Sequence, residues 1–186
     1  MKLIKTYAGA DDIISELGRC HNEDGKDVQF EISKDESSLD DSIALRQENK
    51  YPEGFGLIVI SSAINEKLLQ RKDIVLLGIS NYSKKELEEL EGNKVRYFTM
   101  KKITQIGMEE IIDIAMENAV RFGKLCISVN LDVLDRAFCS RGVVGGMTTR
   151  ELICAVQRLK MMKNLKAAEI CGDDSKISAK LAKELA

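Results

Sequence analysis

The segment Cys126–Phe138, "CISVNLDVLDRAF", joins a continuous apolar run to three polar residues. The run predicts a strand over residues 124–131 that is buried on both faces. Asn130 and Asp132 are two residues apart and so lie on the same side of a strand, and Asp135 follows just beyond it. In open parallel sheets, ligands bind beyond the carboxyl ends of the strands. The segment therefore predicts a polar site at the end of a central strand.

Two interpretations of these polar residues stay open on the residues alone. Carboxylate and amide oxygens suit a hard cation such as Mg²⁺, Mn²⁺ or Ca²⁺, which would offset the repulsion between neighbouring carboxylates. Alternatively, Asp132 and Asp135 accept hydrogen bonds from backbone amides in the turn after the strand.

The rest of the chain alternates apolar runs with helical patterns, which predicts parallel strands joined by crossover helices. The segment 37–50 is polar and fits either a helix or a loop. We expect one domain, residues 1–186, with an α/β fold: a three-layer α/β/α arrangement around a mainly parallel sheet. The expected strands are 1–8, 27–33, 55–61, 73–80, 94–100, 124–131 and 165–171, and the expected helices are 11–20, 62–72, 83–92, 107–123, 148–162 and 175–186.

Composition narrows the classes of partner. The formal net charge is −2, with 28 basic and 30 acidic residues, so the basic footprint of a nucleic-acid-binding protein is missing. No stretch approaches the roughly 20 apolar residues that span a bilayer, and no cleavable apolar segment is visible, so we expect a cytoplasmic protein without membrane contact. Five scattered cysteines are expected to be buried free thiols, and the single histidine, His21, cannot form a His-rich metal site.

The segments "SVNLDVLDRAF" and "GVVGGMTTREL" resemble the signature of the arginase/agmatinase (ureohydrolase) family. That signature is roughly S-x-D-x-D-x-x-D-P-A-F followed by G-G-L-T-x-R-E. The resemblance implies an arginase/deacetylase-like fold and two Mn²⁺ ions held by four Asp and two His. The ions would activate a water that attacks a guanidinium carbon. The matching residues are Ser128, Asp132, Asp135, Ala137, Phe138, Gly145, Gly146, Thr148, Arg150 and Glu151.

Two upstream segments extend the resemblance over nearly the whole chain, without the family's first segment. "DVQFEISKD" is similar to a family strand that ends in D-A-H-x-D, with Glu31 at the first Asp, Ser33 at the His and Asp35 at the last Asp. "YAGADDII" is similar to the family's G-G-D-H-S-I turn, with Asp12 at the His. The vestigial metal positions implied by the resemblance are Asp12, Glu31, Asp35, Asn130 and Asp132.

The departures from the family pattern weaken that metal centre. Both imidazole ligands are absent, and Asn130 replaces an anionic ligand by a neutral one, which removes a full charge from a site for two dications. We therefore expect no cofactor, with Mn or Mg as the alternative if Asp35, Asp132 and Glu31 hold a single cation. Arg136 stands at the usual proline position, where it either pairs with Asp132 or Asp135 or is solvated.

Glu151 has two interpretations. The resemblance gives it a substrate-binding role toward a cationic group. Its position three residues after Thr148 in "TTRE" also predicts a helix capping box, which accounts for an early-helix glutamate without any ligand.

We expect a non-catalytic binding or structural protein that forms a homo-oligomer through an exposed sheet edge. The alternative is a metal-dependent hydrolase of C–N bonds in a guanidino or amidino compound, with a rebuilt carboxylate site. A third alternative is a sensor in which Glu151 and Asp132 bind a small cationic ligand such as a polyamine.

Overall fold

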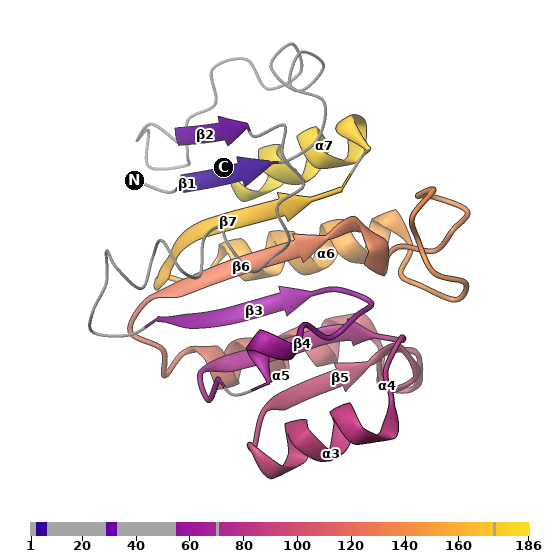
Figure 1. The fold of residues 1–186 in the computed structure, drawn as a ribbon. Coiled ribbons are helices and arrows are strands. Elements are labelled where there is room, and N and C mark those ends of the chain that lie inside the picture. The colour runs from indigo at the N-terminus through magenta and orange to yellow at the C-terminus, as the bar shows by residue number, and fades with distance from the viewer. Residues whose placement is uncertain (1–2, 7–28, 33–54, 70, 173) are drawn as a thin grey trace.

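Seven parallel strands form one sheet in the computed structural model, which describes residues 3–6, 29–32, 55–69, 71–172 and 174–186 (Figure 1). The strand order is β2-β1-β7-β6-β3-β4-β5, and each strand pairs in parallel with its neighbours. The strands are β1 (Leu3–Thr6), β2 (Gln29–Ile32), β3 (Gly56–Ile60), β4 (Ile74–Ile79), β5 (Arg96–Thr99), β6 (Leu125–Asn130) and β7 (Leu165–Cys171).

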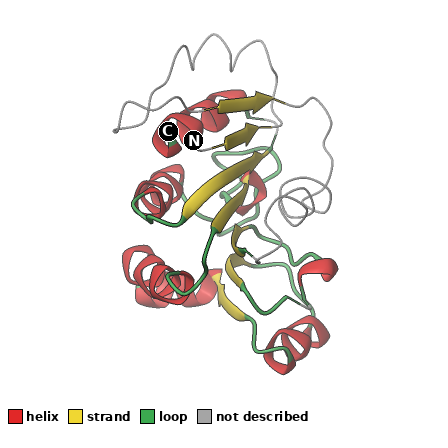
Figure 2. Cartoon of the chain, turned by 90° about the vertical axis from the view of Figure 1, so that its left-hand side faces the viewer, coloured by secondary structure: helices red, strands yellow, loops and turns green. Residues whose placement is uncertain are grey.

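Helices cover both faces of this sheet, so the expected three-layer α/β/α fold is confirmed (Figure 2). Helices α4 to α7 pack on one face, while α3 and a short 3₁₀ turn, η1, lie on the other. The α-helices are α3 (Lys84–Gly92), α4 (Met100–Ile106), α5 (Met108–Ala119), α6 (Thr149–Lys160) and α7 (Ser175–Leu185), and the 3₁₀ turns are η1 (Glu66–Leu68) and η2 (Leu131–Val133).

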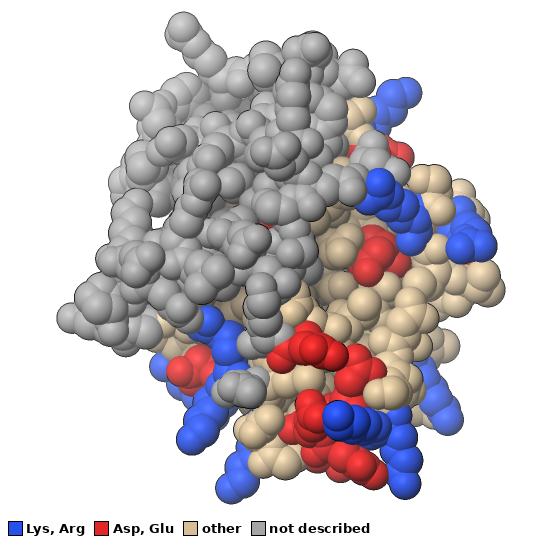
Figure 3. Space-filling view, in the orientation of Figure 1, with Lys and Arg blue, Asp and Glu red and all other residues tan. Residues whose placement is uncertain are grey.

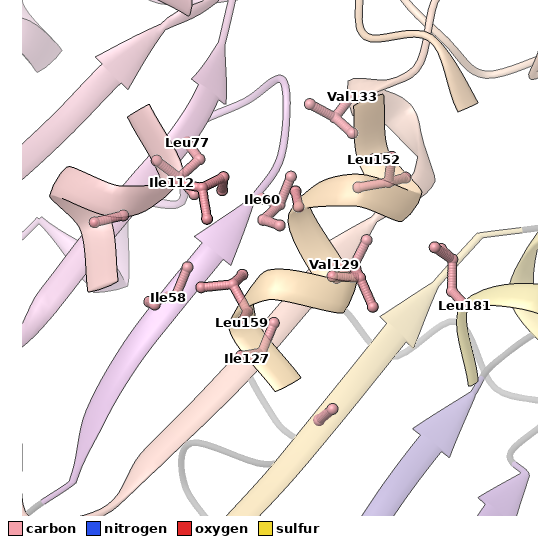
Figure 4. Close-up of a cluster of buried hydrophobic side chains, with 14 of the residues drawn as sticks. Ile58, Ile60, Leu77, Ile112, Ile127, Val129, Val133, Leu152, Leu159 and Leu181 are labelled. Atoms are coloured by element: carbon pink, nitrogen blue, oxygen red, sulfur yellow. The ribbon is translucent and has the colours of Figure 1, made fainter. Parts of the chain in front are cut away.

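The central strands β3, β4 and β6 are apolar on both sides because each lies between two helical layers. Ile58, Ile127 and Val129 contribute to the larger core beneath α5 and α6, and Figure 4 shows Ile58 and Ile127 beside Leu159. Leu57 and Val59 belong to the second core on the opposite face. The continuous apolar runs in the sequence therefore mark strands inside the sheet.

The prediction of a helix over residues 62–72 is wrong for those of its residues that the structure describes. Only η1 forms there, because the chain leaving β3 runs alongside the segment that follows β4. The backbone oxygen of Ser62 accepts from the N–H groups of Ser80 and Asn81, both at 2.9 Å, and Ala63 bridges Asn81. The expected helix 11–20 and the segment 37–50 lie outside the described residues. No described helix combines the length and apolar character that a membrane span requires.

Candidate functional site

Asn130 ends β6 and caps the turn that follows it. Its side-chain oxygen Oδ1 accepts a hydrogen bond from the backbone N–H of Asp132 at 3.1 Å, where η2 begins. An amide oxygen serves this purpose as well as a carboxylate does. The neutral residue at the first of the three polar positions therefore has a local structural role.

Asp132 projects from η2 toward the end of β3, the neighbouring strand. Its carboxylate accepts from the Ser62 backbone N–H at 3.1 Å and from the Ser62 hydroxyl at 2.8 Å. The Ser61 hydroxyl lies 3.3 and 3.4 Å from the two carboxylate oxygens. Both serines are buried. The face of Asp132 that points to the adjacent strand is thus occupied by hydrogen-bond donors of the protein itself.

Burial raises the pKa of Asp132 above the ordinary aspartate value, and the hydrogen bonds from Ser62 and Ser61 offset only part of that effect. Asp135 behaves oppositely. Its oxygens accept from the backbone N–H of Ala137 at 2.8 Å and of Gly145 at 2.7 Å, and these bonds lower its pKa. The turn-capping interpretation is confirmed for Asp135, which closes the loop of residues 136–146.

These opposite shifts predict opposite pH dependences of stability. Native Asp132 holds its proton more tightly than the unfolded chain does, so its contribution is present at low pH and is lost as pH rises through its raised pKa. Asp135 stabilises the fold above the ordinary aspartate pKa, and that contribution is lost as pH falls through its lowered pKa. Asp132→Asn should therefore gain melting temperature relative to the parent as pH rises from 3 to 7, whereas Asp135→Asn should lose it.

The two variants are each other's control, since both replace one aspartate of the same segment by its amide. In Asp132→Asn the side-chain oxygen still accepts from the Ser62 N–H, and the serine hydroxyls can rotate to accept from the new amide. Melting curves at half-unit pH intervals give the comparison. The same slope in both variants would contradict the assignment of the shifts.

Glu151 lies in the first turn of α6 and completes a capping box with Thr148. Its Oε2 accepts from the Thr148 N–H at 2.7 Å and hydroxyl at 2.8 Å, and the Glu151 N–H donates to the Thr148 hydroxyl at 3.2 Å. The helix-cap interpretation of Glu151 is confirmed. Its role toward a cationic substrate stays a prediction.

The sheet order does not bring Glu31 together with Asp132. Glu31 lies on β2, at the edge of the sheet, and β1 and β7 separate that strand from β6. Three strand spacings amount to about 14 Å, too far for both residues to bind one metal ion.

Asp12, Ser33 and Asp35 lie outside the described residues. Arg136 is exposed, and no ion pair joins it to Asp132 or Asp135 in the described part of the chain.

Sequence reasoning missed two polar features of this region. The first is the Ser61–Ser62 pair that faces Asp132. The second is Glu169 on β7, which is only 2% exposed, lies in register with Ser128 of β6 and accepts from the Cys171 thiol at 3.5 Å. A signal for Glu169 was available, since it is an acidic residue inside the otherwise apolar run "LKAAEIC". A buried glutamate is uncommon without a partner or a function.

The described residues do not fit a two-metal centre. Within that part of the chain, no three His, Cys, Asp or Glu side chains are grouped so that they could share a metal ion. The carboxylate at the centre of the site, Asp132, receives donors from Ser61 and Ser62, and a cation cannot occupy the same side of the carboxylate as a donated hydrogen.

An all-parallel sheet between two helical layers, with polar residues at the carboxyl end of β6, defines the α/β class of this protein. A sequence model described as the Arginase family matches residues 24–183, which is most of the chain, and the chain belongs to that family.

Curated relatives support this membership over a shorter range. The arginase of Staphylococcus aureus (strain MRSA252) is 26% identical over 116 residues, covering 58% of this chain and 37% of that protein. The arginase of Entamoeba histolytica is 23% identical over 113 residues, covering 59% of this chain and 38% of the other. The matched part thus spans little more than a third of these relatives.

Solved structures with the same fold cover nearly the whole chain. Arginase from Bacillus cereus superposes with a TM-score of 0.74 at 14% identity, covering 99% of this chain and 97% of the other. Formimidoylglutamase from Bacillus subtilis gives a TM-score of 0.70 at 16% identity, covering 99% and 85%. At these identities the likeness establishes the fold.

Proposed function

We propose that this chain is an arginase-family domain without a dinuclear manganese centre and that it acts as a non-catalytic binding or structural protein. The observation that carries the proposal is the environment of Asp132. Four hydrogen-bond contacts from Ser61 and Ser62 converge on its carboxylate. They occupy the side of the carboxylate that faces β3, so a metal ion cannot bind the carboxylate from that side.

The neighbouring positions support the same proposal. Asn130 is neutral, and its oxygen already accepts the Asp132 N–H. The end of β3 is Ser61-Ser62-Ala63-Ile64-Asn65, which contains neither a carboxylate nor an imidazole. Two dications held close together need anionic ligands between them, and the half-buried Asp132 is the one carboxylate that these strand ends direct into the site.

Metal titration tests this proposal. A ligand that binds only the native state raises the melting temperature, by an amount that grows with its concentration over Kd. We expect Mn²⁺, Mg²⁺ and Ca²⁺ at 1 mM to shift the melting temperature of the purified protein by less than about 1 °C. We also expect no urea release from arginine or agmatine. Arginase from Staphylococcus aureus serves as the positive control for both assays.

Two manganese ions per chain by elemental analysis, together with urea release, would overturn the proposal and establish the hydrolase. A melting shift with one bound cation and no urea release would replace it with a single-cation site.

The proposal also expects a homo-oligomer. A binding or structural role is commonly performed by symmetric assemblies of one chain. Light scattering after size-exclusion chromatography should give at least twice the chain mass of 20.8 kDa. A single species at the chain mass over a tenfold range of concentration would count against this expectation.

A further inference from the structure

Positive charge is concentrated at the edge of the sheet where the strands begin. In the described chain, the connections that lead into β4, β5, β6 and β7 contain six cations, Arg71, Lys72, Lys94, Arg121, Lys124 and Lys163, and one acid, Asp73. The connections that follow β3, β4, β6 and β7 contain two cations, Arg136 and Arg141, and three acids, Asp132, Asp135 and Asp174. In Figure 3, Lys and Arg stand at the lower left, where described strands begin, beside a smaller acidic patch, and further Lys and Arg lie along the right-hand side. The net charge of −2 conceals this asymmetry.

Two apolar side chains are exposed at the same edge. Val120 ends α5 with 71% of its surface exposed, and Met161 ends α6 with 76% exposed. Each is followed in its turn by an exposed cation, Arg121 and Lys163 respectively. We call the two turns, residues 120–124 and 161–164, the amino-edge surface.

Hydrogen bonds join these two turns into one unit. The Asn164 side-chain nitrogen Nδ2 donates to the backbone oxygens of Ala119 at 3.0 Å and Phe122 at 2.7 Å. In return, the Leu125 backbone N–H donates to the Asn164 backbone oxygen at 2.8 Å. The apolar and cationic side chains therefore project from a fixed framework, which lowers the entropy lost on binding.

Helix electrostatics explains only part of this arrangement. Cations favour helix C-termini, and Lys160 lies in the last turn of α6. The effect falls off within that turn, whereas Arg121 and Lys163 lie beyond the helix ends. It also gives no reason for Val120 and Met161 to be exposed.

We propose that the amino-edge surface docks an acidic segment of a partner protein that also carries apolar side chains. The cations match acidic residues, and the exposed Val120 and Met161 match apolar ones. Single-stranded nucleic acid is disfavoured, because the one aromatic side chain of this surface, Phe122, is 5% exposed and offers no stacking platform. A bilayer is disfavoured, because two apolar side chains on turns provide less than the apolar helix face of interfacial anchors.

This surface lies at the opposite edge of the sheet from Asp132 and does not depend on the proposed function. Its failure and the failure of the non-catalytic proposal are measured separately, since metal content and urea release do not report on peptide binding.

The test uses a fluorescent 12-residue peptide of alternating Glu and Leu and measures its anisotropy at 50 mM salt. The variant Val120→Ser, Arg121→Glu, Met161→Ser, Lys163→Glu should bind at least tenfold more weakly than the parent. The control variant carries the same kinds of change on the carboxyl side of the sheet: Lys101→Glu, Lys102→Glu, Phe138→Ser and Val144→Ser, all exposed positions. It should bind within twofold of the parent.

Equal weakening by both variants, or equal binding of a Lys–Leu peptide by the parent, would overturn the proposal. Parallel arms use vesicles containing phosphatidylserine and a 12-nucleotide RNA. The proposal would also be overturned if the parent bound the vesicles or the RNA but not the peptide, and if the four substitutions in the amino-edge surface abolished that binding. Melting curves check that the variants fold. If the variant with four substitutions does not fold, Arg121→Glu alone replaces it in the test, and we expect it to weaken peptide binding at least threefold.

Discussion

Replacing Gly146 by alanine is expected to lower the free energy of unfolding by about 3 kcal/mol, the upper range for overpacking a tightly packed site. A Cβ at this position would lie 2.6 Å from the backbone oxygens of Val133 and Leu134 and from the carbonyl carbon of Leu134. All three neighbours are main-chain atoms, so no side chain can rotate away to make room. The segment leading into α6 must then separate from η2.

The separation breaks specific contacts. The Met147 N–H donates to the Val133 oxygen at 2.9 Å, and the Asp135 N–H donates to the Met147 oxygen at 2.8 Å. These bonds attach the loop of residues 136–146 to the strand end that carries Asp132. Urea denaturation of Gly146→Ala should show the loss as a lower midpoint with an unchanged m-value.

Two other glycines provide matched controls. Gly145 has a φ of +77° with no atom within 4 Å of its added Cβ, so alanine there should cost only about 1–2 kcal/mol of backbone strain. Gly123 has open space and no positive φ, and Gly123→Ala should stay within about 0.5 kcal/mol of the parent. A Gly146→Ala effect no larger than that of Gly145→Ala would contradict the steric argument.

Leu159→Ala is expected to destabilise the protein by a similar amount, about 3 kcal/mol, through a cavity in the larger core. Leu159 lies on α6 with 0% of its surface exposed, and Figure 4 shows it over the sheet beside Ile58 and Ile127. For a chain of this length, that loss corresponds to a fall in melting temperature of roughly 6–12 °C.

Met161→Ala is the control, because this residue follows two positions later and is 76% exposed. Its effect should be within about 0.5 kcal/mol. Calorimetric melting of the parent, Leu159→Ala and Met161→Ala measures both losses of stability. Equal effects of the two substitutions would mean that α6 does not pack on the sheet in the described way.

The strands inside this sheet are predictable from sequence, because a strand that is buried on both faces is a continuous run of apolar residues. The runs "FGLIVIS" and "DIVLLGIS" are apolar throughout and form β3 and β4, inside the sheet. The alternating "DVQFEIS" contains the edge strand β2, Gln29–Ile32. Helix starts were also predictable where a capping residue is present, as at Ser83 and Thr148, whose capping boxes form.

Local sequence patterns led to a wrong prediction at two places in the chain. The helix α4 was missed because its sequence follows β5 without a break, and only the cap at Thr99 and the glycine at 107, with φ of +102°, separate it from its neighbours. The helix expected after β3 fails because nonlocal bonds to Ser80 and Asn81 hold that segment extended. Nonlocal contacts of this kind leave no periodic signal in the sequence.

The candidate site was predictable for residues that act within their own turn. Asn130 and Asp135 cap amides a few residues away, and their spacing alone suggests this role. The partners of Asp132 depend on which strand lies beside β6. Three of the strands expected from the sequence end in serine, at Ser33, Ser61 and Ser80, and only the order of the sheet selects Ser61.

The pairing of β1 with β7 joins the beginning of the described chain to its last strand. Leu3 lies opposite Ala167 and Thr6 opposite Ile170, so more than 160 residues separate these partners in sequence. On the ribosome, β1 has no partner on this side until β7 has been synthesised. Closing so large a loop is entropically slow, and the amino-terminal strands present unpaired backbone groups to chaperones throughout translation.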